Sequence, residues 1–475
     1  MTPRILPLAL ALALAGCAVG PDYQRPAAPL PESYGEAAET AAIDKRWWTL
    51  FEDATLNELV DQALLNNADL RLAIARVEEA DAVAREVGAA WFPEIDLAAT
   101  AGRSKMSTKT AAWNPGAPRI VKDLSAALTT TYEIDVWGSI RRSNEAARAN
   151  MLASRYSRDA IRLSIAGFVS SAYLALRAVD AQLAVAAESL ASREESLQLV
   201  KTRLDAGYVS PLDLHEASSA VAGMQAAIID FRRQRDLLEH QLALLTANPA
   251  LKIAVGDLRQ LPLPPIPPAG LPADLIEARP DVREAEQRLV AANASIGIAK
   301  AGYYPRFMLT GSLGNASKSL GDFLGAGTWT VGLGLFMPLL DFGRTSARVD
   351  QATALNEQSL IAWQNSLQIA YKEVRDALVN LHRNSEAEAA RAALVADTRD
   401  ALTIYEHRYA EGYSSYLEVL VAQRNHNDAL EALIATRQAR LTAAVDLFKA
   451  LGGGWQAASE EGEAVAVATD AHPDN

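Results

Sequence analysis

Cysteine is the residue type whose position in this chain most clearly predicts chemistry. The 475 residues include a single cysteine, Cys17, which follows a lone Arg4 and an apolar run from Ile5 to Ala15. A basic residue followed by an apolar run of this length, ending in small residues, is typical of a secretory signal. Because a lone cysteine excludes an intrachain disulfide framework, its position is better explained by covalent modification at a cleavage site.

The residues at this boundary resemble a bacterial lipobox, Leu14-Ala15-Gly16-Cys17. Cleavage there would leave Cys17 as the new N-terminus carrying lipid, and an uncleaved free thiol is the alternative. Ala18 stands where an aspartate would have suggested retention at the inner membrane. We therefore expect a signal peptide over residues 1–16, lipidation at Cys17 and an outer-membrane location.

Patterns of catalytic residues are sparse in the remaining sequence. The six histidines are scattered without an HExxH arrangement, and no GxSxG nucleophile elbow occurs. The stretch Gly311–Lys318 superficially resembles a phosphate loop, but it lacks the second glycine before the lysine and is better explained as a hairpin loop. A net charge of -13 without a basic stripe argues against nucleic acid. We expect no enzyme, no cofactor and no catalytic or metal site.

The clearest structural pattern is a period of two, which a helix cannot present. Apolar residues alternate with small, hydroxylated or acidic ones from Leu124 to Gly138, and a similar alternation runs from Trp329 to Leu340. Alternating runs also precede each of these, at Ile95–Ala101 and Phe307–Leu313. Strands of about 9 to 11 residues can cross a bilayer. We therefore expect two membrane hairpins, with two soluble hairpins packed on a core as the alternative.

Aromatic residues flank these strands as interfacial girdles would. They are Trp91, Phe92, Trp137, Tyr303, Tyr304 and Phe342. Four strands cannot close a barrel, because about eight is the smallest closed number. Several chains must therefore share one barrel.

An internal repeat organises the chain. Asp69-Leu70-Arg71 returns as Asp281-Val282-Arg283, and Arg203, Gly207 and Tyr208 return as Arg408, Gly412 and Tyr413. Each copy is expected to contain a helix, two strands, a long helix, a break and a helix. The expected organisation is a lipidated tether and equatorial segment over 17–53, a first repeat over 54–248, a proline-rich linker over 249–272, a second repeat over 273–455 and an acidic, disordered tail over 456–475.

The tether between lipid and body is expected to be extended from Pro21 to Tyr34, with Asp22 and Arg25 solvated. Further along, two stripes show coiled-coil spacing, and an ordinary buried helix face is the alternative. These stripes are Leu183, Leu190, Leu197 and Leu204, and Val395, Leu402, Tyr409 and Tyr416. A helix from Ser139 to Ala206 would measure about 100 Å, too long for a globular domain, so we expect a projecting rod.

The rod is expected to turn at Gly207-Tyr208-Val209-Ser210-Pro211, since glycine permits the turn and proline suits the start of the returning helix. The second copy is expected to turn at Gly412-Tyr413-Ser414-Ser415-Tyr416.

Five motifs together resemble the outer-membrane efflux factor family, the TolC-like channels, in its OprM- or NodT-like lipoprotein branch. They are the lipobox, Val19-Gly20-Pro21-Asp22-Tyr23, Arg279-Pro280-Asp281-Val282-Arg283, Leu340-Asp341-Phe342-Gly343 and Lys449-Ala450-Leu451-Gly452-Gly453-Gly454-Trp455. The resemblance covers nearly the whole mature chain. It implies a mixed membrane α+β fold in which a homotrimer shares a 12-stranded β-barrel on a periplasmic α-barrel of coiled-coil helices.

The resemblance further implies a passive exit duct for small amphiphilic compounds or drugs, anchored in outer-membrane lipid and served by a periplasmic adaptor and an inner-membrane RND-type pump. A type I secretion duct for polypeptides and a periplasmic coiled-coil scaffold without transport are the alternatives. Adaptor docking is expected at the two turns, because they lie furthest from the membrane and expose Tyr208, Tyr413 and Tyr416. Tyrosines that merely pack the turns are the alternative.

In the family the channel narrows just after the second turn, commonly with an aspartate at the place of Val421. Leu417 and Val421, at i and i+4, instead predict an apolar constriction that closes by dewetting, and interhelical core is the alternative. Glu418, Asp213 and Tyr409 are further gate candidates for polar contacts that hold the helices shut.

Overall fold

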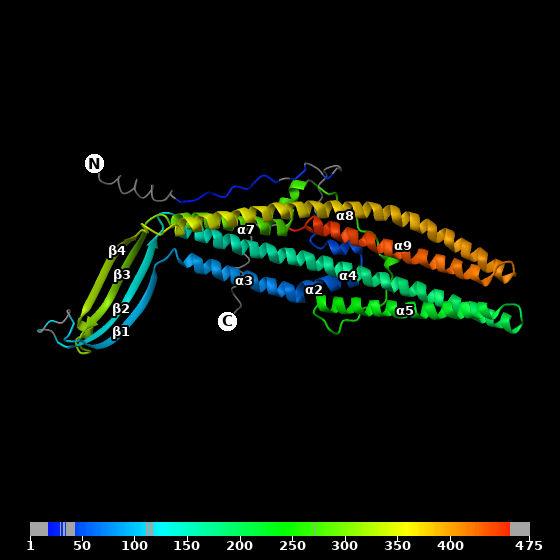
Figure 1. The fold of residues 1–475 in the computed structure, drawn as a ribbon, viewed down its shortest axis with the longest axis horizontal. Coiled ribbons are helices and arrows are strands. Elements are labelled where there is room, and N and C mark those ends of the chain that lie inside the picture. Colours follow the sequence, from blue (N-terminus) through cyan, green and yellow to red (C-terminus); the bar gives the residue numbers. More distant parts are fainter. Residues whose placement is uncertain are drawn as a thin grey trace. The chain divides into compact units, whose positions relative to one another are not determined.

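The computed structural model describes residues 18–28, 30, 31, 34, 43–110, 114, 116, 118–270 and 272–456. The lipobox with Cys17 and the acidic tail from residue 457 onward lie outside the described residues. The chain divides into two compact units. Figure 1 labels its helices and strands. Unit 1 combines the N-terminal segment up to Ala27 with Arg76–Arg155 and Glu284–Trp363, and unit 2 combines Ala28–Ala75, Tyr156–Arg283 and Gln364 onward.

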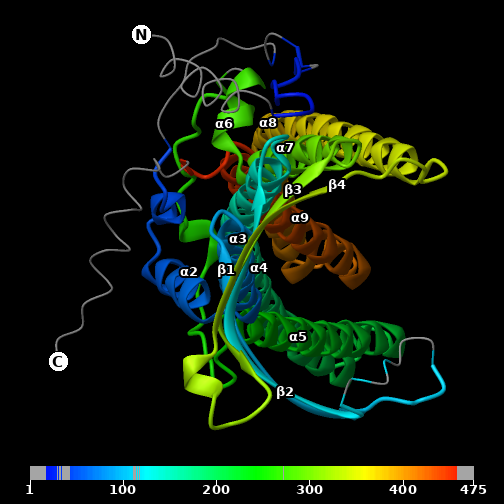
Figure 2. The same ribbon diagram turned by 90° about the vertical axis from the view of Figure 1, so that its left-hand side faces the viewer.

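Unit 1 contains one antiparallel sheet in which the four strands follow chain order. The strands are β1 (Glu94–Lys105), β2 (Ile120–Ile134), β3 (Arg306–Ser317) and β4 (Gly327–Phe336). Both predicted hairpins are present, and β2 pairs with β3 to join them. The sheet curves strongly, with β1 and β4 as its edges (Figure 2).

The predicted strand ends are wrong at several points. β2 begins at Ile120, before the expected Leu124, and ends at Ile134, where the amide of Val136 bonds back to the Ile134 carbonyl at 2.8 Å. β4 ends at Phe336 rather than at Leu340. Pro338 follows closely and has no N–H to donate to a ladder, so the alternation beyond Phe336 is not a strand.

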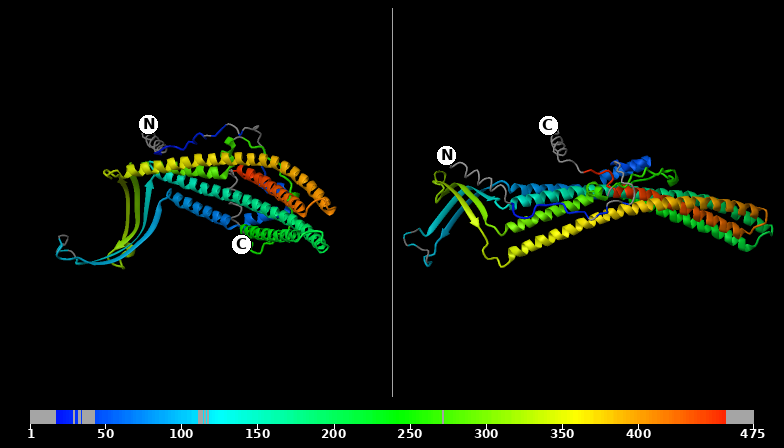
Figure 3. Two further views of the ribbon diagram at one scale, coloured as in Figure 1. Left: turned by 45° about the vertical axis from the view of Figure 1, so that its right-hand side comes forward. Right: turned by 90° about the horizontal axis from the view of Figure 1, so that it is seen from above.

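The two copies of the repeat contain helices of matching length. α3 (Ala68–Ala89) and α7 (Pro280–Ala301) have 22 residues each, α4 (Ser139–Asp205) and α8 (Arg344–Ala410) have 67, and α5 (Pro211–Leu245) and α9 (Tyr416–Ala450) have 35. In unit 2, α4 lies beside α5 and α8 beside α9 (Figure 3). The shorter helices are η1 (Trp47–Phe51), α2 (Ala54–Asn66), η2 (Leu258–Gln260), η3 (Pro272–Asp274), α6 (Leu275–Ala278) and η4 (Phe323–Gly325).

The leucine stripe of α4 packs on α5, as coiled-coil spacing predicts. Leu183 and Leu190 are partly buried against a cluster of Ala186, Met224 and Ile228. The stripe predicted for the second copy cannot include Tyr416, because Tyr416 is the first residue of α9 and does not lie on α8.

A buried ion network fixes the start of the proline-rich linker in unit 2. The Asp180 carboxylate accepts hydrogen bonds from Arg177, Arg235 and the backbone amide of Gly256. Arg177 also donates to the Ala254 carbonyl at 2.6 Å. Moving the linker away would remove hydrogen bonds from these buried charged side chains, which is energetically unfavourable. The network therefore holds the linker against α4 and α5.

The N-terminal residues of unit 1 form ion pairs with the helices, although the Asp22 side chain remains 88% exposed. Asp22 pairs with the buried Arg142 at 2.6 Å, and Arg25 makes two hydrogen bonds to the Glu286 carboxylate. The amide of Val19 donates to the Trp137 carbonyl at 2.9 Å. The expectation that Asp22 and Arg25 are merely solvated is therefore wrong for this segment.

Among the described residues one helix, α4, is long and apolar enough to cross a membrane, judged by length and composition alone. Half of its most apolar stretch of 18 residues is buried within the protein. The buried side chains include Val169, Tyr173 and Leu174, so the apolar character is that of a core helix.

Candidate functional site

The pairing register separates the side chains of the sheet into two unlike faces. On one face Leu97, Leu128, Leu313 and Trp329 lie opposite one another in a row across all four strands. The next rows on that face add Ile95, Val331, Leu309 and Leu333, and all eight are exposed. A continuous apolar surface of this extent indicates contact with lipid or with another protein.

The opposite face is small and hydroxylated. Asp96, Thr129, Ser312 and Thr330 form one row, and Thr131, Thr310 and Gly332 belong to the next. Apolar and polar faces that alternate along every strand are the arrangement of a membrane barrel wall.

The flanking aromatics gather at one end of the sheet, where β1 and β3 begin and β2 and β4 end. Trp137 stacks on Tyr304 with ring centroids 4.5 Å apart, and its indole donates to the Pro305 carbonyl. Phe92 and Phe342 are strongly exposed at the same end. This placement agrees with aromatic residues at a membrane interface.

The stretch that resembles a phosphate loop is neither that nor a hairpin loop. Gly311 to Ser317 belong to β3, and the hairpin loop begins after them. A Cβ added at Gly314 would come within 2.2 Å of the Ala126 carbonyl oxygen, so glycine here permits close strand packing. Among the described residues, no group of three His, Cys, Asp or Glu side chains could hold a metal ion.

Both helical turns of unit 2 have the same construction. Gly207 and Gly412 adopt positive φ, and the amides of Tyr208 and Tyr413 bond back to the carbonyls of Arg203 and Arg408, as in a Schellman motif.

Capping boxes then begin the returning helices. Ser210 pairs with Asp213 at the start of α5, and Ser415 pairs with Glu418 at the start of α9. The sequence carries the signal for these boxes, Ser-x-x-Asp/Glu before a helix. Asp213 and Glu418 therefore bind their own turns in this structure.

Two of the three turn tyrosines are exposed and one is buried. Tyr208 is 82% exposed and Tyr413 is 74% exposed, whereas Tyr416 is 2% exposed. The prediction that Tyr416 is exposed is wrong, because as the first residue of α9 it points between the helices.

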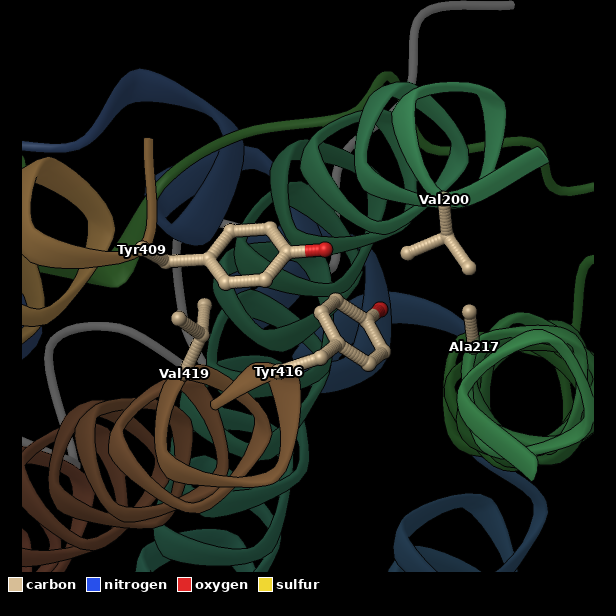
Figure 4. Close-up of a cluster of buried hydrophobic side chains, with 5 residues drawn as sticks. All are labelled: Val200, Ala217, Tyr409, Tyr416 and Val419. Carbon is tan, nitrogen blue, oxygen red and sulfur yellow. The ribbon is translucent and has the colours of Figure 1, made fainter. Parts of the chain in front are cut away.

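Tyr416 belongs to a buried cluster with Val200, Ala217, Tyr409 and Val419 (Figure 4). The rings of Tyr409 and Tyr416 lie 5.6 Å apart, and burial raises the pKa of Tyr416 to about 12. Arg203 of α4 stacks on the Tyr409 ring and donates to the carbonyls of Tyr409 and Ala410. Residues of both repeats thus join at this cluster.

The two apolar gate candidates are exposed beside that cluster. Leu417 is 54% exposed and Val421 is 39% exposed. They line a groove of about 310 Å³ between α8 and α9, together with Thr398, Ala401, Tyr405, Glu418, Ala422 and Asn425. An apolar surface is therefore available there for another chain or for a closed constriction.

The model of the outer membrane efflux protein family matches residues 59–248 and 271–453 of this chain. The chain belongs to the outer membrane efflux protein family. The toluene efflux pump outer membrane protein TtgF of Pseudomonas putida is 34% identical over 478 residues, which cover 97% of this chain and 99% of that protein. Outer membrane protein OprJ of Pseudomonas aeruginosa is 36% identical over 470 residues, with 97% of each chain covered.

Solved structures agree with this assignment. The CmeC outer membrane channel of Campylobacter jejuni superposes with a TM-score of 0.87 at 25% identity, covering 95% of this chain and 98% of that one. The chain is therefore an outer-membrane efflux channel of a tripartite efflux system, with the mixed α+β fold of the TolC-like channels. The family and TtgF are named for efflux and CmeC is named as a channel, which favours an efflux duct over the scaffold and over a duct for polypeptides.

Proposed function

We propose that three copies of this chain form one passive exit duct, which conducts small amphiphilic compounds from the periplasm to the exterior. The observation that carries the proposal is the sheet, which exposes an apolar face, a hydroxylated face and two unpaired edges. An open edge offers unmade backbone hydrogen bonds, and full closure removes it. Pairing β1 of one copy with β4 of the next would give a closed barrel of twelve strands with the apolar face toward lipid.

The domain organisation expected from the sequence fits this duct. The repeats would supply the wall, and the lipidated residues before them would assist anchoring. A single acyl chain gives only marginal anchoring and several chains give firm anchoring, so lipid on Cys17 should matter most before the barrel inserts. Labelled palmitate that fails to appear on the protein would refute this part.

The adaptor would dock at the turns, on Tyr208, Val209, Ser210 and Pro211 and on Tyr413, Ser414 and Ser415. Exposed tyrosines on rigid, doubly capped turns support this role, since aromatic residues are enriched at protein interfaces. Tyr416 and Tyr409 would stabilise the second turn through the buried cluster to which they belong. A proton-driven pump of the RND type would deliver the substrate.

The constriction would be formed by Leu417 and Val421, repeated three times around the axis. Their exposure in one chain supports this role, because a buried pair could not line a pore. Glu418 and Asp213 would contribute indirectly, by fixing the start of α9 and α5 through their capping boxes.

Planar-bilayer recording tests the duct. We expect purified trimers to give unitary conductances. These conductances should rise in the Leu417→Ser variant, because the substitution makes the apolar constriction polar. A protein that inserts as a trimer and conducts nothing, with or without this substitution, would indicate a scaffold.

A further inference from the structure

A cavity of about 560 Å³ lies in unit 1 at the end of the sheet where the aromatics gather. Its walls come from the ends of β2 and β4, the start of β3, the end of α7 and the starts of α4 and α8. Three arginines are among its lining residues, Arg306, Arg344 and Arg348, and all three are solvent-exposed. Arg344 and Arg348 are one turn apart on α8, so they share a helix face.

The positive charge of this cavity is only partly balanced within the protein. Among the residues that the structure describes, no carboxylate oxygen lies within 4 Å of these three guanidinium groups. Of the two carboxylates in the lining, Asp135 is occupied by the Arg141 side chain and by the amides of Ile140 and Arg141. Glu133 is the other carboxylate of the lining, and outside the lining the Asp341 carboxylate interacts electrostatically with Arg344. The three arginines therefore outnumber the carboxylates of the lining, in a chain whose net charge is -13.

The cavity also offers flat apolar surface. The stacked pair of Trp137 and Tyr304 lines it, and Arg306 lies over the Phe336 ring at 5.4 Å. An arginine held on an aromatic face presents its N–H donors edge-on, which suits bidentate hydrogen bonding to two oxygens of an anionic group. Aromatic walls beside guanidinium groups match a ligand with an apolar body and an anionic end.

The register shows which face of the sheet the cavity serves. Arg306 pairs with Phe336, and Glu133 pairs with Met308. These positions are even steps from Thr310 and Thr131, so they share the hydroxylated face. In the duct proposed above, that face lines the lumen, which places the cavity on the path of the substrate.

The repeat shows that the fold does not require the arginines. Arg306 is the first residue of β3, and the first residue of β1 is Glu94. Arg344 and Arg348 are the first and fifth residues of α8, and the corresponding residues of α4 are Ser139 and Ser143. The same elements therefore form in the first copy without any of the three positive charges.

We propose that this cavity is a luminal binding site for small organic anions with an aromatic or apolar body, such as aryl sulfonates and carboxylates. The site rests on the proposed duct only for its luminal position. Its ligand class follows from the arginines and rings alone.

Titration calorimetry on detergent-solubilised trimers tests the site, with naphthalene-2-sulfonate as the probe. We expect one site per chain, with an affinity that falls as salt is added. The double variant Arg344→Ser with Arg348→Ser copies the first repeat, so it should fold, and it should bind at least about tenfold more weakly because two charge-assisted hydrogen bonds are lost. Arg344→Lys with Arg348→Lys should keep part of the affinity.

Arg399→Ser with Arg408→Ser is the matched control, because it removes two exposed arginines of the same helix outside the cavity. This control variant should bind the probe like the unmodified protein. Equal binding by the unmodified protein and by the variant that carries Arg344→Ser with Arg348→Ser would overturn the proposal. The absence of binding by intact unmodified trimers would overturn it as well.

Nanodiscs separate a luminal ligand from a lipid headgroup. We expect binding to be the same in phosphatidylcholine and in phosphatidylglycerol discs, and displacement of the probe by phosphatidylglycerol would overturn the luminal position. Because these measurements detect binding and not flux, trimers that bind the probe but conduct nothing would refute the duct and leave the anion site standing.

Discussion

At the scale of single residues, Leu417 and Val421 combine apolar character with exposure beside a well-packed tip. We expect Val421→Asp to raise cation selectivity in planar bilayers, since three aspartates would form a ring. Leu417→Ser should mainly increase leak, because a wetted constriction cannot close by dewetting. Unchanged conductance and selectivity in both variants, with trimers intact, would remove these residues from the gate.

The turn tyrosines form a second pair with opposite expectations. Tyr416→Ala empties a buried position and should destabilise the tip by about 3 to 5 kcal/mol. Tyr413→Ala removes an exposed ring and should change stability by no more than about 0.5 kcal/mol. Hydrogen exchange of the α9 amides would measure the difference.

Tyr413→Ala should weaken adaptor binding although it leaves the stability of the protein nearly unchanged. A cysteine-reactive cross-linker attached to the Ser414→Cys variant should capture the adaptor, and it should capture less when Tyr413→Ala is added to that variant. If that substitution leaves the yield unchanged, Tyr413 is not a docking residue.

At the scale of elements, Glu388 connects α8 to α9 through Arg437 and Arg440, at 2.9 Å each. Burial raises the pKa of Glu388, but the hydrogen bonds from Arg440 and Arg437 outweigh it and hold the pKa below 4.5. A lowered folded pKa contributes stability that is present above the unfolded value and is lost as the pH falls through the folded one.

Glu388→Gln removes that contribution. We expect it to lower the thermal midpoint at neutral pH and to converge with the unmodified protein well below pH 4.5. Glu386→Gln, on the exposed side of α8 with Arg383, is a suitable control and should have a smaller effect. A difference that persists undiminished in acid would contradict the assignment to Glu388.

The sequence predicted best those elements whose periodic pattern continues over many residues and whose ends are marked by turn residues. The 67-residue helix from Ser139 and the turns at Gly207 and Gly412 follow from spacing and from glycine. The end of β4 was missed because the alternation continues past Pro338, where the missing amide decides the boundary.

Contacts between residues far apart in the sequence could not be predicted in this way. Asp22 finds Arg142 and Arg25 finds Glu286 only after the segments meet, so composition alone suggested a free tether. Likewise, nothing in a turn sequence shows that Tyr416 is buried while Tyr413 is exposed. The arginine cavity could not be predicted from the sequence either, because its three arginines lie on two separate elements, β3 and α8.

At the scale of the whole molecule, one chain would supply a third of the barrel wall in the proposed trimer. Its sheet has two unlike faces and two open edges, and those edges account for the need for further copies. The duct, the gate ring and the luminal position of the anion site therefore all depend on how the edge strands of neighbouring copies pair.

Disulfide trapping of β1 against β4 tests that relation most directly, in a background where Cys17 is the only other cysteine. Asp96→Cys on β1 would be combined with cysteine at Thr328, Thr330 or Gly332 of β4. We expect at least one pair to yield a covalent trimer under oxidation. Cysteine at Thr129 on the interior strand β2, on the same row as Asp96, should yield none with the same partners. Covalent products that never reach a trimer, or equal trapping from Thr129, would contradict the shared barrel.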